Sequence, residues 1–84
     1  MTRLRPGTGV AITEDADTVY AAYLPGGPIV VLDGIAALIW AEACGGERET
    51  IIERVAEATD AAPEVIRADV DAFVADLMAR GLLQ

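Results

Sequence analysis

The sequence predicts one α+β domain over residues 1–84, in which a three-stranded antiparallel sheet is followed by three α-helices, a winged helix-turn-helix-like fold. The length is that of a single domain. Residues 1–32 are rich in β-branched residues and contain both tyrosines and three of the four prolines. Residues 33–84 are instead rich in Ala, Glu, Asp and Arg, with apolar residues at helical spacing.

Two turn signals divide the first part into strands. The acidic segment 14–17 (EDAD) and the segment 25–28 (PGGP) are both typical of tight connections. Short connections join strands that are neighbours in a sheet, so we predict an antiparallel meander. The predicted strands are Val10–Thr13, Thr18–Leu24 and Ile29–Leu32.

The third predicted strand, Ile29–Leu32, is apolar at every position. Such a run is typical of a strand that is covered on both faces. In a sequential meander this strand is also an edge, and an apolar edge promotes aggregation unless something covers it or pairs with it. Two interpretations stay open: its own helices or a homodimer partner cover it, or an extended peptide docks there as an added strand.

Capping signals mark the first two helices. Asp33 is a good N-cap for a first helix that runs to about Cys44. A second helix starts at Thr50, where Thr50 and Glu53 fit the capping box. The residues expected to face the core are Ile35, Leu38 and Ile39 in the first helix and Ile51, Ile52, Val55 and Ala58 in the second.

The third helix, residues 63–80, is predicted to be the longest. Pro63 suits its first position. Gly81 ends it, and Leu82 is placed to pack back on Leu77 as in a Schellman motif. The residues assigned to its core face follow steps of four, three and four: Ile66, Val70, Phe73 and Leu77.

The formal net charge of −8 argues against whole classes of partner. Nucleic acids and anionic membranes both attract Lys and Arg rather than Asp and Glu. In a winged helix the third helix would contact DNA, but here its acidic residues outnumber its arginines. We therefore expect no nucleic acid and no membrane, and keep an acidic winged-helix transcriptional regulator as an alternative function.

The residue inventory argues against an enzyme. Without His, Ser or Lys, the usual pairs of base and nucleophile cannot be assembled. The sequence has neither Cys/His metal spacing nor an Asp-rich calcium loop, so we expect no metal and no cofactor. Cys44 lies near a helix C-terminus, which disfavours a thiolate, and is expected to be a packing residue. A single cysteine and no signal peptide indicate the cytoplasm.

The segment Tyr23–Leu83 resembles the PqqD-like family, also called RiPP recognition elements. Residues 28–40 (PIVVLDGIAALIW) look like the family's third strand, helix cap and Ala-rich Ile-Trp segment, although the family commonly has Asn where Asp33 stands. Residues 45–59 (GGERETIIERVAEAT) look like its second helix. Residues 66–83 (IRADVDAFVADLMARGLL) are similar to its Asp-Val, Phe, Leu and terminal Gly-Leu.

This resemblance implies a non-catalytic domain that binds the leader segment of a ribosomally made precursor peptide. The leader would lie antiparallel to the third strand, in a groove beside the third helix. Implied partners are that leader and a modifying enzyme, leader peptidase or radical enzyme of the same pathway, such as a lasso-peptide pathway. The residues assigned to peptide binding are Ile29, Val30, Val31 and Leu32 on the strand and Arg67, Asp71, Val74 and Met78 on the helix.

The four helix residues have different expected roles. Val74 and Met78 would supply apolar pockets, with plain core as the alternative for both. Asp71 would pair with a basic residue of the leader and Arg67 with an acidic one. Trp40 is expected in the core. A structural module that homodimerises through the same strand remains the other alternative function.

Overall fold

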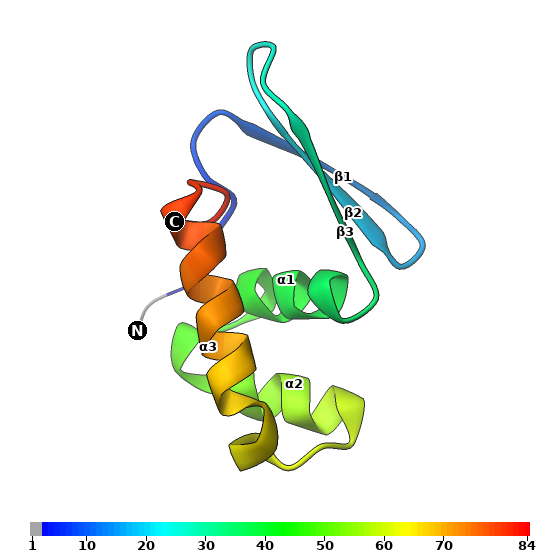
Figure 1. Ribbon diagram of the computed structural model, residues 1–84, viewed down its shortest axis with the longest axis vertical. Coiled ribbons are helices and arrows are strands. Elements are labelled where there is room, and N and C mark those ends of the chain that lie inside the picture. Colours follow the sequence, from blue (N-terminus) through cyan, green and yellow to red (C-terminus); the bar gives the residue numbers. More distant parts are fainter. Residues whose placement is uncertain (1–2) are drawn as a thin grey trace.

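The computed structural model describes residues 3–84, and its element order confirms the predicted α+β fold (Figure 1). Three strands come first and three α-helices follow, with a short 3-10 helix before the second. The strands are β1 (Val10–Asp15), β2 (Thr18–Tyr23) and β3 (Ile29–Asp33). The helices are α1 (Ile35–Gly45), η1 (Arg48–Thr50), α2 (Ile51–Thr59) and α3 (Pro63–Ala79).

The sheet is the predicted meander, with strand order β1-β2-β3 and both pairs antiparallel. β1 is two residues longer than expected, because Glu14 and Asp15 pair with Val19 and Thr18 instead of forming the turn. The turn shrinks to two residues, and Ala16 adopts a positive φ of 54° there. Tight hairpin turns need such a conformation to match the twist of the strands.

The core lies between one face of the sheet and the three helices. Val19, Ala21 and Leu32 point from the sheet into this layer and are buried. In an antiparallel strand alternate side chains lie on one face, so the residues between them form the opposite, outer face of the sheet. The helices contribute Trp40, as expected, together with Ile39, Val55, Val70, Val74 and Leu77.

The predicted start of the first helix is wrong by one residue. β3 continues through Asp33, and Gly34 is the N-cap, with a φ of 57° that glycine adopts at low cost. In the described chain this cap has no side-chain hydrogen bond, so Asp33 does not cap the helix. The buried face is also rotated: Ile35 is 59% exposed, while Ala37 and Ala43 join Ile39 and Trp40 in the core.

The predicted capping box at Thr50 is also wrong. η1 precedes α2, and within residues 3–84 the Thr50 side chain makes no capping hydrogen bond to the backbone N–H groups of the helix. The Thr50 hydroxyl donates to the Glu47 carbonyl at 3.1 Å and accepts from Arg54 Nε at 3.1 Å. Arg54 also bonds the Glu42 carboxylate at 2.9 Å and the Glu47 carbonyl at 2.7 Å. The arginine therefore ties the end of α1 to the start of α2.

The buried face of α2 also differs by one residue from the prediction. Ala58 is exposed, and Ala56 takes its expected place in the core.

The predicted ends of the third helix are confirmed. Pro63 opens α3, and Gly81 follows its C-cap with a φ of 77°. The Leu82 N–H donates to the Leu77 carbonyl at 2.9 Å and the Gly81 N–H to the Met78 carbonyl at 3.0 Å, the Schellman pattern. Leu77 and Leu82 are both fully buried.

A terminal clasp, formed by residues 5–7 and 82–84, joins the two ends of the described chain. The N–H groups of Arg5 and Gln84 each donate to the other residue's carbonyl, at 3.0 and 2.9 Å. The Gly7 N–H donates to the Leu82 carbonyl at 2.8 Å. The clasp holds Leu82 and Leu83 in the core. No helix among residues 3–84 has both the length and the apolar character needed to span a membrane.

Candidate functional site

One edge of β3 is open. Among residues 3–84, β3 pairs with β2 alone. The Tyr23 N–H donates to the Pro28 carbonyl at 3.3 Å, so these two residues form a hydrogen-bonded pair just beyond β3. Because such pairs alternate in an antiparallel ladder, Val30 and Leu32 bond to β2, whereas the N–H and C=O groups of Ile29, Val31 and Asp33 point away from it. This edge can accept another strand.

The outer face of β3 is exposed, contrary to the expectation that both faces would be covered. Val30 is partly buried and Leu32 is 6% exposed on the inner face. Ile29 and Val31 are 67% and 55% exposed on the outer face. Tyr20, the β2 partner of Val31, is exposed beside them. Ile29 and Val31 therefore combine outward backbone groups with exposed apolar side chains.

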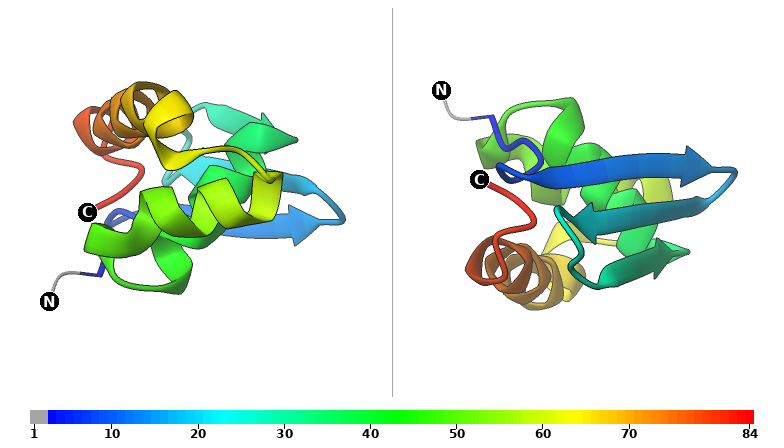
Figure 2. Two further views of the ribbon diagram at one scale, coloured as in Figure 1. Left: turned by 90° about the horizontal axis from the view of Figure 1, so that it is seen from below. Right: turned by 90° about the horizontal axis from the view of Figure 1, so that it is seen from above.

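Helix α3 lies on the same side of the molecule as the open edge. The two views of Figure 2 place α3 near β3 and away from β1. The Tyr23 hydroxyl donates to the Arg80 carbonyl at 2.8 Å, which fastens the end of β2 to the end of α3. An added strand on β3 would therefore run on the α3 side of the sheet.

The four helix residues assigned to peptide binding do not form one open stripe. Arg67 and Asp71 are exposed, Met78 is partly buried against the core, and Val74 is a core residue at 6% exposure. For Val74 the structure thus supports the core alternative. The assignment of all four to a peptide groove stays a prediction.

Their position around α3 is informative. Asp71 and Val74 line a cleft of about 320 Å³ together with Arg48, Ile51 and Ile52 of η1 and α2. This flank of α3 therefore faces α2. On a helix, Ile66 and Phe73 lie on the other side of Val70 from Asp71, which is the flank turned away from this cleft. Both are partly buried against the core.

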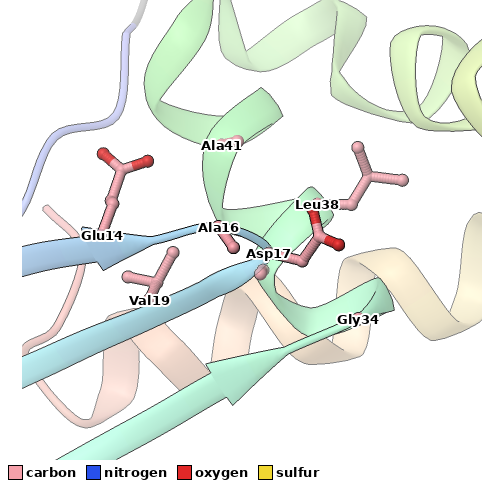
Figure 3. A pocket seen from close by; sticks show the side chains of 8 residues that line it. Glu14, Ala16, Asp17, Val19, Gly34, Leu38 and Ala41 are labelled. Carbon is pink, nitrogen blue, oxygen red and sulfur yellow. The ribbon is translucent and has the colours of Figure 1, made fainter.

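Another cleft lies at the far end of the sheet, between the β1–β2 hairpin and α1 (Figure 3). Small residues such as Ala16, Gly34 and Ala41 leave this space, and its charged members are Glu14 and Asp17. Glu14 and Asp17 therefore make the lining of this cleft acidic. Nearby, burial raises the pKa of the Cys44 thiol, and the Glu14 carboxylate raises it further. Cys44 is therefore a poor nucleophile, as its place in the chain predicted.

Sequence reasoning missed Tyr20 as a member of the exposed outer face of the sheet beside β3. The signal was present, because Val19 and Tyr20 are adjacent in a strand and must face opposite sides of the sheet. A buried Val19 places Tyr20 outside, next to Val31. The flank of α3 that carries Ile66 and Phe73 had no comparable signal in the sequence.

Comparison with known proteins identifies the family. Residues 7–83 match the family of coenzyme PQQ synthesis protein D (PqqD). The chain belongs to this PqqD family, and the resemblance found in the sequence is confirmed. Among solved structures it is similar to TbiB1, described in complex with the TbiA(beta) leader peptide. The two share 22% identity and superpose with a TM-score of 0.82 over 95% of this chain and 94% of that one, which shows a common fold. Curated proteins gave no match.

Proposed function

We propose that this domain binds the leader segment of a ribosomally synthesised precursor peptide as an added strand on β3. One observation carries the proposal: the N–H and C=O groups of Ile29, Val31 and Asp33 point outward from an edge that no other strand of residues 3–84 pairs with. Strand addition uses groups of this kind for affinity and alternate side chains for specificity. Membership of the PqqD family and the leader peptide described with TbiB1 support it.

Backbone bonds alone do not account for useful affinity. A few such bonds at about 1 kcal/mol each fall short of the roughly −8 kcal/mol that micromolar binding requires. Apolar contacts have to supply the remainder. Ile29 and Val31 offer such contacts on the outer face, and Val30, Ile66 and Phe73 offer them on the inner side towards α3. Arg67, Asp71 and Met78 remain assigned contacts further around the helix.

Bound in this way, the leader would be held without being modified. The domain's role is to raise the concentration of the precursor near a modifying enzyme, leader peptidase or radical enzyme. No catalytic step is assigned to this chain. Residues 1–84 would act as one cytoplasmic recognition domain, and a lasso-peptide or related pathway would supply the precursor.

Val31→Pro tests the edge directly. Proline removes an outward N–H that β2 does not use, and its ring occupies the space of an added strand. The fold should persist, since proline is tolerated on sheet edges. We expect the affinity for the leader to fall at least about tenfold, or about 1.4 kcal/mol. The probe is the leader of a precursor peptide encoded beside the gene for this chain, and the measurement is isothermal titration calorimetry.

Glu14→Pro is the matched control. The Leu24 N–H donates to the Gly9 carbonyl at 2.8 Å, so by the same alternation the Glu14 N–H points outward from β1, at the opposite edge. This variant should bind the leader as the unmodified chain does. Equal affinity of all three proteins, with circular dichroism showing that each is folded, would rule out strand addition at β3.

A further inference from the structure

We infer that the outer face of β3 selects a leader segment in which a basic residue is followed, at alternate positions, by two apolar residues. The basic residue lies opposite Asp33 and the apolar ones opposite Val31 and Ile29. The inference rests on the proposed strand addition and names the class of peptide sequence that this site takes.

The register follows from the outward backbone groups. An antiparallel strand beside β3 forms hydrogen-bonded pairs with Asp33, Val31 and Ile29, in that order along the added strand. The side chains of such pairs lie on one face, about 5 Å apart at their Cβ atoms. That face is the exposed outer one, so three alternate leader residues meet the side chains of Asp33, Val31 and Ile29 without the helices intervening.

Asp33 defines the first position. It ends β3, is exposed, and pairs with Thr18, whose other neighbour is Asp15 of β1. In the described part of the chain the ion pairs are Arg54–Glu42 and Arg80–Asp76, so Asp33 belongs to neither. An opposite charge directly across a sheet is favourable and a like charge is unfavourable. With a net charge of −8 around it, this position favours Lys or Arg.

The next two positions are apolar. Val31 is the β3 member of a cross-strand row with Thr13 and Tyr20, and Ile29 is the β3 member of a row with Ala11 and Ala22. At 55% and 67% exposure these side chains lose contact with water when an apolar residue is placed beside them. Aromatic and β-branched leader residues should be preferred, because such cross-strand pairs are the favourable ones.

A displayed peptide library tests this pattern. Randomised strand-length segments on yeast are selected for binding to the purified chain, and clones that also bind the Val31→Pro variant are removed. We expect the remaining clones to share Lys or Arg, then any residue, then an apolar one, any residue, and a second apolar one. When the same library is selected for binding to the Asp33→Arg variant, the basic residue should be replaced by Asp or Glu.

Asp15→Arg is the matched control, since it makes the same charge change on the same face but lies about 14 Å from the added strand, three strand spacings away. A peptide from the selected pool should lose about two- to five-fold in affinity with Asp33→Arg and less with Asp15→Arg. The loss should shrink in high salt.

The outcomes separate the two proposals. Clones that need Val31 but show no charge preference, the reverse order of charge and apolar residues, or equal effects of the two Arg variants would overturn the pattern and leave strand addition standing. A library in which every binding clone also binds the Val31→Pro variant would overturn strand addition, and the pattern with it.

Discussion

At the scale of single residues, Asp33 and Thr50 show that a residue with a good capping side chain does not always cap the helix that follows it. Both have the side chains of good N-caps, and neither caps its helix. Asp33 is the last residue of β3, and the Thr50 hydroxyl is hydrogen-bonded to the Glu47 carbonyl and to Arg54 Nε. A capping side chain therefore acts only where the tertiary structure leaves the backbone before the helix free to place it. Trp40, which has no such choice, is buried as expected.

Cys44 gives a prediction on pH. Burial raises the pKa of its thiol above the ordinary 9.0, and Glu14 adds to the shift. The unfolded chain therefore releases this proton first, so the free energy of unfolding should fall as the pH rises above about 9. Cys44→Ala removes the titrating group and should flatten that decline. Urea unfolding gives the free energy of unfolding of both proteins at each pH from 7 to 10. The same dependence on pH in both would contradict the raised pKa of Cys44.

At the scale of the element, α3 shows the limit of what helical periodicity can predict. Steps of three and four correctly predict a helix with Val70 and Leu77 in the core. They do not say which flank meets α2 and which lies towards the sheet, because both flanks carry apolar residues next to charged ones. Val74 and Met78 on one flank and Ile66 and Phe73 on the other look alike in the sequence. Only the packing of η1 and α2 against Asp71 and Val74 separates them.

A pair of charge reversals on α3 tests which flank meets the leader. Asp69 and Asp71 are both exposed, but helical spacing places Asp69 on the side of Ile66 and Phe73. Asp69→Arg should change the leader's dissociation constant by about two- to five-fold, and Asp71→Arg should change it less. Calorimetric titration at low salt measures both. The opposite ranking would support the assignment of Asp71 made from the sequence.

At the scale of the whole molecule, the order of strands and helices was predictable because each break has local chemistry. Pro25, Gly26, Gly27 and Pro28 separate β2 from β3, and Pro63 and Gly81 bound α3. The terminal clasp was not predictable. It joins residues 75 to 79 positions apart through backbone atoms, which leave no mark on the choice of side chains.

Gly7→Ala tests the clasp. A Cβ atom at this position would lie 1.8 Å from the Gly81 carbonyl oxygen, so the two ends of the chain would have to separate. We expect a loss of about 2–4 kcal/mol in stability, because Leu82 and Leu83 leave the core with the clasp. Gly45→Ala is the control, since apart from its chain neighbours and the adjacent backbone of α1 no atom of the described residues lies within 4 Å of its Cβ position. Thermal unfolding followed by circular dichroism compares them.

The clasp also affects how the domain can be connected to other chains. Arg5 and Gln84 are hydrogen-bonded neighbours, and Figure 2 shows the two ends of the described chain at one end of the molecule, away from the β1–β2 hairpin. A short glycine linker would therefore suffice for circular permutation, with new termini opened at the exposed turn of Ala16 and Asp17. For the same reason the domain could be inserted whole into a surface loop of a host protein, since entry and exit lie side by side.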